Sequence, residues 1–279
     1  MQPEVTDGAV RTDSVSHRHH SSLSSVASAA RLLKEFAGER REMGVTEAAR
    51  RLGLGKSTAH RLLNTLTEER LLERDPRTGA YRLGLAMFEL GRSVSTYSIL
   101  HEVCVPVMDQ LRAATKATVQ VSVLDGREVV YVERRETAST LRMFGRVGHR
   151  FPANCTGSGK ALLAFLPPSR LEELLDGWEL TGRTEASVSD VAVLRAQLVE
   201  IRERGWSENV NEAEMGVASV AAPIRDADGA VVAAISVVVP TAGLNGDALK
   251  RYPRPCQDAA AAVSRRLGYR PPSNERDQP

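Results

Sequence analysis

The 279-residue sequence has few cysteines, few aromatic residues and no long apolar run. Its cysteines, Cys104, Cys155 and Cys256, lie far apart and form no CxxC pair, which argues against a zinc module or a disulfide framework and indicates a reducing cytoplasm. Without a run of about 18 apolar residues, no membrane-spanning helix is expected. The N-terminus also lacks the basic start and apolar stretch of a signal peptide. We therefore expect a cytoplasmic globular protein with no membrane partner.

Charge is nearly balanced, with 37 Lys and Arg against 35 Asp and Glu, so the total says little about partners. Its distribution says more, because residues 50–67 contain Arg50, Arg51, Lys56 and Arg61 but no acidic residue. A local basic stripe on a near-neutral chain is typical of a DNA-contacting element.

Residues 1–22 are polar and end in a histidine-rich cluster, so a disordered tail is expected there. A solvated tail explains these histidines best. A metal site is the minor alternative, because no partner ligands lie nearby in the sequence. We expect no metal and no cofactor in this protein.

Three short helices are predicted next. The first covers 24–37 and places an apolar set on one face: Val26, Ala29, Ala30, Leu33 and Phe36. The second covers 45–52, with Thr46 in position to cap it. The third covers 57–70, and its apolar stripe is Ala59, Leu62, Leu63 and Leu66.

Residues 71–84 predict a strand, a turn and a second strand. Asp75-Pro76 starts the turn, and Gly79 supplies the permissive backbone conformation. Two short strands after a helix-turn-helix form a wing. Residues 23–84 are therefore expected to be a winged helix-turn-helix DNA-binding domain.

A linker helix over 85–100 is expected to join this domain to the rest of the chain. It opens a largely helical stretch that runs to residue 114. Its apolar residues fit a structural linker and a linker that also dimerises equally well.

The apolar pattern changes to period two from Thr118 onward. Residues 118–124 and 127–135 flank Asp125-Gly126, a strong hairpin signal, and a second hairpin is predicted over 217–240. The other expected elements are helices over 157–166, 168–175, 191–204 and 248–267, the last interrupted near Pro253 and Pro255. This order predicts an α+β domain over 101–270, with an antiparallel sheet flanked by helices. Residues 271–279 are expected to be a disordered tail.

The third helix is the candidate for the major groove, where the N-terminal residues of a recognition helix reach base edges. Its polar face carries side chains that hydrogen-bond bases or phosphates: Lys56, Ser57, Thr58, His60, Arg61 and Asn64. In the wing, Arg74, Arg77 and Arg82 are candidates for backbone or minor-groove contacts, although each is as well explained as a solvated arginine.

Two segments resemble a phosphate-binding loop without matching it. That motif needs four residues between its glycines and a preceding strand. Only one residue separates Gly53 from Gly55, and a predicted helix, not a strand, precedes them. In Gly157-Ser158-Gly159-Lys160, Asn154 replaces the first glycine and Ala161 replaces the final Ser or Thr.

Three stretches resemble the IclR family of bacterial regulators. They are KSTAHRLLNTLTEERLLERDPRTGAYRLG, FPANCTGSGKALLAFLP and IRERGWSENVNEAEMGVASVAAPIRDADGAVVAAISVVVP. The resemblance runs from about Ser24 to Leu267. It implies a winged helix-turn-helix followed by a GAF-like effector-binding domain. It also implies a homodimer or homotetramer on palindromic double-stranded operator DNA, most often a repressor, with a small organic acid or aromatic effector.

The family's effector pocket maps onto two parts of this sequence. By position, the residues that the resemblance implies are Asn154, Cys155, Gly157, Ser158, Asn209, Val217, Ser219, Ser236 and Val238. Some members carry a serine where this chain has Val238, which favours an effector with more apolar surface. The residues alone support the pocket more weakly, since any half-buried sheet edge shows the same mixture.

Two other functions compete with a ligand-responsive regulator. One is a Cys-dependent hydrolase, with Cys155 as nucleophile and His149 near in sequence. No third group is placed to orient His149, and a small buried thiol explains Cys155 better. The other is an architectural DNA binder with a degenerate sensor domain. We expect a regulator and not an enzyme.

Overall fold

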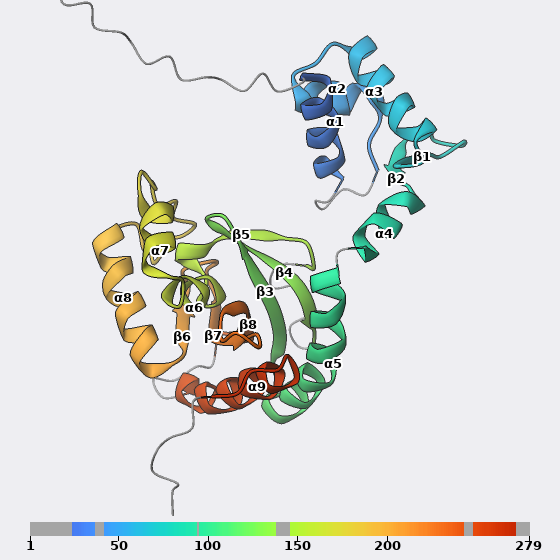
Figure 1. Ribbon diagram of the computed structural model, residues 1–279. Helices are drawn as coiled ribbons and strands as arrows, with labels where there is room; N and C mark the ends of the chain where they lie inside the picture. Colours follow the sequence, from blue (N-terminus) through green and yellow to red (C-terminus); the bar gives the residue numbers. More distant parts are fainter. Residues whose placement is uncertain (1–23, 37–41, 94, 138–145, 243–247, 272–279) are drawn as a thin grey trace, which may run out of the picture. The chain divides into compact units, whose positions relative to one another are not determined.

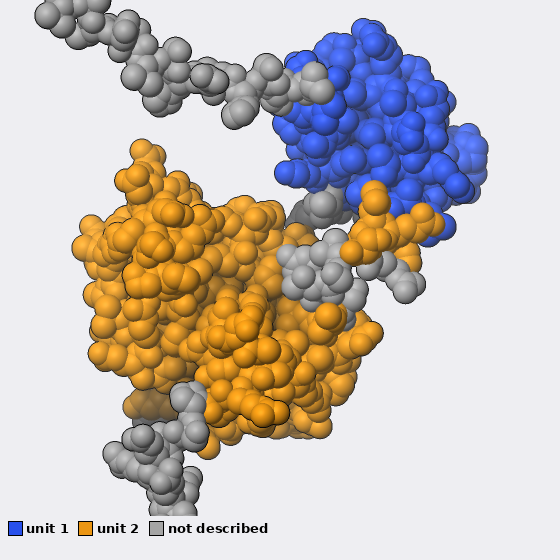
Figure 2. All heavy atoms as spheres, viewed as in Figure 1, with its two compact units in different colours: residues 1–87 blue, residues 88–279 orange. Residues whose placement is uncertain are grey.

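The computed structural model describes residues 24–36, 42–93, 95–137, 146–242 and 248–271. Within the chain, residues 1–87 and 88–279 form two compact units, which Figure 2 shows in different colours. The tails predicted over 1–22 and 271–279, apart from Pro271, lie outside the described residues.

The first unit is a winged helix-turn-helix. Its elements are α1 (Ser24–Glu35), α2 (Val45–Leu52), α3 (Lys56–Glu68), β1 (Leu72–Arg74) and β2 (Tyr81–Leu83). The two strands are antiparallel. Asp75 Oδ1 accepts hydrogen bonds from the backbone N–H groups of Arg77 and Thr78, and Gly79 has a φ of 69°, as the predicted turn requires. Buried Leu32, Leu63 and Tyr81 belong to one apolar cluster that holds the unit together.

Two details of the first unit differ from prediction. Thr46 does not cap α2: Gly44 is the N-cap, no side-chain cap bond forms, and Thr46 lies inside the helix. The buried side chains of α1 are Ser28 and Leu32, and Phe36, directly after the helix, is buried as predicted, while Val26 is 61% exposed. The four-residue spacing of the buried side chains selects a face turned away from Val26.

The predicted linker helix is divided into two helices. α4 (Leu85–Arg92) ends within it, and α5 begins at Ser95 and continues to Thr115. The single helix expected over 85–100 is therefore corrected to all of α4 and the start of α5. Leu85, Phe88 and Leu90 of α4 are exposed apolar side chains.

The second unit is built on a six-stranded antiparallel sheet with the strand order β5-β4-β3-β8-β7-β6 (Figure 1). The strands are β3 (Thr118–Asp125), β4 (Glu128–Arg135), β5 (Arg150–Pro152), β6 (Ser207–Val210), β7 (Val217–Arg225) and β8 (Val231–Pro240). The predicted hairpins are β3–β4 and β7–β8, with Gly126 and Gly229 at positive φ. The short edge strands β5 and β6 were not predicted.

The remaining elements cover both faces of this sheet. They are η2 (Ala153–Cys155), α6 (Gly157–Ala164), α7 (Pro168–Leu175), α8 (Val191–Arg204), η3 (Ala248–Arg251) and α9 (Pro253–Arg266). α5 and α9 share an apolar cluster with one face, including Met108, Val121, Ile235 and Val263. α6, α7 and α8 share a second cluster with the other face. The closing helical stretch is interrupted near Pro253, as predicted, because η3 ends at Arg251 and α9 begins at Pro253. Pro253 and Pro255 lie in the first turn of α9, where no intrahelical N–H bond is lost.

Helix α8 offers a direct stability test at its cap. Asp190 Oδ1 accepts hydrogen bonds from the N–H groups of Ala192 and Val193, at 2.7 and 3.0 Å. Asp190→Ala leaves both donors without this acceptor and is expected to lower the free energy of unfolding by about 1 kcal/mol. Chemical denaturation measures the loss. Asp190→Asn keeps an acceptor and serves as control, so an equal loss in both variants contradicts the capping role.

Candidate DNA-binding and effector-binding sites

The N-terminal half of α3 presents a polar surface. Lys56, Ser57, Thr58, His60 and Arg61 are all exposed, and this half of the helix contains no acidic residue. Ala59, Leu63 and Leu66 are buried on the opposite side, as predicted. The apolar stripe therefore fixes which side of the helix faces outward.

Asn64 and the wing arginines differ in their surroundings. Asn64 is half-buried, and its Oδ1 accepts a hydrogen bond from the hydroxyl of Tyr81 at 3.1 Å. Arg82 pairs with Glu73 across the hairpin at 3.1 Å, and the Arg74 guanidinium lies 5.7 Å from the Tyr81 ring centroid. Arg77 is exposed at the tip. Asn64 thus serves at least to hold α3 against the wing.

On the second unit, the predicted effector residues of the sheet lie on one face. Asn209, Ser219 and Val238 are paired in register across β6, β7 and β8. On the next rung, Ser236 lies opposite Gln120 of β3. Residues two apart in a strand share a face, so Val217 joins Ser219 on it.

Polar side chains are concentrated on this face although it is buried. Gln120, Asn209, Ser219 and Ser236 are each at most 9% exposed. The hydroxyl of Ser122, on the same strand as Gln120, is buried and has no hydrogen-bond partner among the described residues. Buried polar groups normally have hydrogen-bond partners, so an unpartnered hydroxyl on this face is a position where a ligand could supply one. The face beneath α5 and α9, by contrast, is apolar.

The loop from Ala153 to Gly157 lies against this polar face. Asn209 Nδ2 donates to the carbonyl oxygen of Cys155 at 2.7 Å. The hydroxyl of Ser207 donates to the carbonyl oxygen of Gly157. A Cβ on Gly157 would lie 2.9 Å from the Ser219 hydroxyl oxygen. The structure therefore brings Cys155, Gly157, Asn209 and Ser219 together.

Asn154 and Ser158 contribute to the loop in other ways. Asn154 is fully buried, and its Nδ2 donates to the carbonyls of Val188 at 2.8 Å and Thr181 at 3.3 Å. This amide therefore ties the loop to the segment before α8. Ser158 is buried in the first turn of α6.

Cys155 is not an activated nucleophile. Its side chain is buried, and burial raises the pKa of the thiol to about 11, with Glu212 adding a smaller increase. Since the thiolate is the reactive form, this thiol is inert near neutral pH.

A buried ion pair lies behind the loop. Lys160 of α6, 3% exposed, places Nζ 2.7 Å from Glu212 Oε1 and 3.1 Å from Gln197 Oε1. The backbone N–H of Glu212 donates to Asn209 Oδ1 at 2.9 Å, which links the pair to the polar face. Burial raises the pKa of Glu212, and Lys160 opposes that rise.

Sequence reasoning missed this pair because it considered Lys160 only as part of a phosphate loop. A signal was nonetheless present: Lys160 stands among Gly, Ala and Leu in a helix that proves to be buried throughout. Buried charges are almost always paired.

Among the described residues, no group of three or more His, Cys, Asp or Glu is arranged to hold a metal ion. None of the described helices is long and apolar enough to cross a membrane.

The comparisons with known families cover both units. Residues 25–76 match the IclR helix-turn-helix domain, and residues 92–265 match the C-terminal domain of bacterial transcriptional regulators of the IclR type. The chain belongs to the IclR family. The resemblance found in the sequence is thus confirmed, and so is the α+β fold.

Individual IclR relatives match along nearly their whole length. The HTH-type transcriptional regulator XynR of Escherichia coli is 33% identical over 247 residues, covering 88% of this chain and 98% of XynR. An IclR homologue from Microbacterium hydrocarbonoxydans, solved with 4-hydroxybenzoate, has a TM-score of 0.78 and 29% identity, covering 87% of this chain and 98% of its own. The repressor BlcR of Agrobacterium tumefaciens has a TM-score of 0.57 and 30% identity, and the match covers 89% of this chain and 99% of BlcR.

Membership of the IclR family establishes the general activity. The chain is a DNA-binding transcriptional regulator with a helix-turn-helix head, and it is not an enzyme. The Cys-dependent hydrolase considered from the sequence is therefore wrong.

Proposed function

We propose that this IclR-type regulator is a repressor controlled by a small organic acid or aromatic effector bound in its second unit. The observation that carries the proposal is the buried polar face formed by Gln120, Asn209, Ser219 and Ser236 beneath the Cys155 loop. Small-molecule sites typically combine apolar surroundings with a few directed polar groups, and this face has both kinds of side chain.

The effector we favour combines a carboxylate or hydroxyl group with an apolar body. The Ser219 hydroxyl supplies a donor, and Val238 lies beside Ser219 in the paired register. The Ser236 hydroxyl donates to the Gln120 carbonyl at 3.5 Å, so its oxygen supplies an acceptor. An aromatic acid satisfies both features. The Microbacterium relative solved with 4-hydroxybenzoate supports this choice of class.

Repression and oligomeric binding complete the proposal. The name of the solved repressor BlcR supports repression. Exposed apolar side chains of α4, at Leu85, Phe88 and Leu90, support association of two or more copies on a palindromic operator in the cytoplasm. An effector controls such a complex by binding one arrangement of the copies more tightly than another.

Fluorescence anisotropy tests the proposal with DNA from upstream of the protein's own gene. The titration is repeated over a salt series and with a panel of aromatic and aliphatic acids. Tight binding that one acid abolishes supports a ligand-responsive repressor. Binding that only fades with salt, for specific and scrambled duplexes alike, indicates backbone contacts alone and contradicts the proposal. Binding that no acid changes favours the architectural DNA binder.

Arg61 is the side chain of α3 with the clearest expected effect. It is exposed and makes no ion pair within the described residues. Arg61→Ala is expected to weaken operator binding by about 1–3 kcal/mol if the guanidinium contacts a guanine edge. The same titration measures it, with a scrambled duplex as control. A loss confined to the operator supports base contact, an equal loss on both duplexes indicates a phosphate contact, and unchanged affinity removes Arg61 from the interface.

A further inference from the structure

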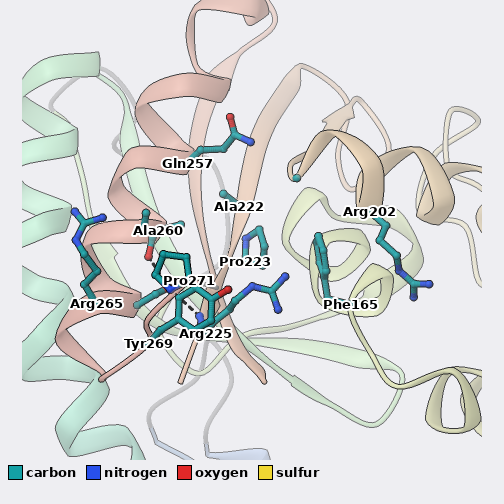
Figure 3. A pocket seen from close by; sticks show the side chains of 13 residues that line it. Phe165, Arg202, Ala222, Pro223, Arg225, Gln257, Ala260, Arg265, Tyr269 and Pro271 are labelled. Atoms are coloured by element: carbon teal, nitrogen blue, oxygen red, sulfur yellow. Dashed lines mark hydrogen bonds between the residues drawn. The ribbon is translucent and has the colours of Figure 1, made fainter. Parts of the chain in front are cut away.

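A second concave surface lies away from the effector residues, in a groove of about 360 Å³. It is lined by residues of α9, by the end of α8 and by the outer part of β7 (Figure 3). β6 pairs with β7 only as far as Ala221, so beyond this point that side of β7 has no strand partner among the described residues. Half-buried Pro223 and exposed Ala261 give the groove an apolar lining.

Arg225 is held rigidly in this groove. Its backbone N–H donates to the Ser264 hydroxyl and its Nη1 donates to the Gly229 carbonyl, both at 2.9 Å. The guanidinium carbon lies 4.8 Å from the ring centroid of Phe165 and 5.8 Å from that of Tyr269. In Figure 3 the side chain extends from β7 between these two rings. A guanidinium fixed in advance loses little conformational entropy when it binds an anion.

Within the described residues, no carboxylate balances the positive charge of the groove. Arg202 and Arg265 line it as well, and none of its lining residues is acidic. Among the described residues, none of the three arginines lies within ion-pair distance of a carboxylate. Arg195 shows the contrast, because both its terminal nitrogens bond to Glu172. Arg202 uses only Nε, which donates to the Ala164 carbonyl.

We propose that this groove is a second ligand site, which binds a small carboxylate with an apolar body. The free edge of the Arg225 guanidinium would bind the carboxylate through charge-assisted hydrogen bonds, and the apolar body would cover Pro223 and Ala261. None of its lining residues belongs to the predicted effector set. The carboxylate has two sources, a free metabolite or the chain itself, since Glu275 and Asp277 follow Pro271 in the sequence.

Saturation-transfer NMR with benzoate tests the site on the full chain, with neutral benzamide as the matched ligand. The expected dissociation constant is about 1–10 mM, the range of a small ligand in an open groove. Arg225→Gln is expected to reduce the part of the benzoate signal that comes from the groove by about threefold or more, through loss of the charged fork. Arg270→Gln, an exposed arginine outside the groove, is expected to leave it unchanged.

Benzoate bound at the effector site adds the same signal to every variant, so the signal of the groove is obtained from the difference between Arg270→Gln and Arg225→Gln and not from their ratio. Equal benzoate signals in Arg225→Gln and Arg270→Gln overturn the proposal, as does equal saturation of benzamide. Because Arg225→Gln also removes packing against Phe165, the exposed pair Arg202→Gln/Arg265→Gln provides a second variant with little risk to folding. A reduced signal there supports the site, and an unchanged signal in both variants overturns it.

A chain ending at Pro271 distinguishes the two sources of carboxylate. A stronger benzoate signal in this shorter chain supports the groove and identifies the chain's own carboxylates as competitors. A signal equal to that of the full chain supports the groove with a free carboxylate as its occupant. Loss of the Arg225 dependence in the shorter chain overturns the proposal.

Discussion

The Lys160→Met variant is expected to lose about 3–5 kcal/mol of the free energy of unfolding of the second unit, because Glu212 keeps a buried charge without its partner. Lys160 is 3% and Glu212 8% exposed. Among the ion pairs of the described residues, Glu212 pairs only with Lys160, so no second cation compensates for its loss. Urea denaturation followed by tryptophan fluorescence measures the loss. Both tryptophans, Trp178 and Trp206, belong to this unit.

Two further variants separate the buried pair from ordinary surface charge. The double variant Lys160→Met/Glu212→Leu removes both charges and is expected to recover most of the loss, since apolar side chains replace buried pairs at little cost. Arg195→Met breaks the exposed pair with Glu172 and is expected to cost less than about 1 kcal/mol. If Lys160→Met costs no more than Arg195→Met, the pair is solvated and does not support the polar face.

Elements whose structure depends on neighbouring residues were predictable. The turn of the wing follows from Asp75 and Gly79, which need only local hydrogen bonds and a permissive backbone. The helix α8 has a capping Asp190 before it and Gly205 in the left-handed conformation after it. For these elements, local sequence and final structure favour the same conformation.

The errors came from elements that tertiary contacts decide. β5 and β6 have three and four residues, too few for an alternating pattern to distinguish them from loops. Thr46 has the right chemistry for a cap, yet the chain begins α2 at Val45, so its hydroxyl lies beyond the capping position. Val26 fits an apolar stripe, but the helix packs through Leu32 instead.

The candidate effector site was predictable only in part, for the same reason. Its residues could be named by resemblance, but their relation depends on register: Asn209, Ser219 and Val238 become neighbours only when three strands pair correctly. The Lys160–Glu212 pair is separated by 52 positions in sequence. No periodicity within either segment shows that the two charges meet.

The Phe88→Asp variant is expected to be monomeric and to bind operator DNA about 100-fold or more weakly. Phe88 is 62% exposed and Leu85, three residues earlier on the same helical face, is 64% exposed. An apolar face of this kind favours contact with a second copy, and a charge buried there without a partner opposes association. Two linked DNA-binding heads bind about 10²–10⁴-fold more tightly than one, because the second head is held at a high effective concentration near its half-site. Light scattering after size-exclusion chromatography measures the mass, and anisotropy measures the affinity.

The neighbouring Glu89→Gln provides the control, because Glu89 is exposed on the same turn and its substitution removes a charge without burying one. It is expected to leave both mass and affinity unchanged. If Phe88→Asp remains an oligomer of the original mass, α4 is not the interface and its apolar residues serve another contact. If the variant is monomeric but binds the operator as tightly as before, one DNA-binding head suffices for recognition. That result contradicts the proposal that the effector acts through the relative arrangement of two heads. Only the joint loss of mass and affinity connects the exposed face of α4 with binding to a palindromic operator.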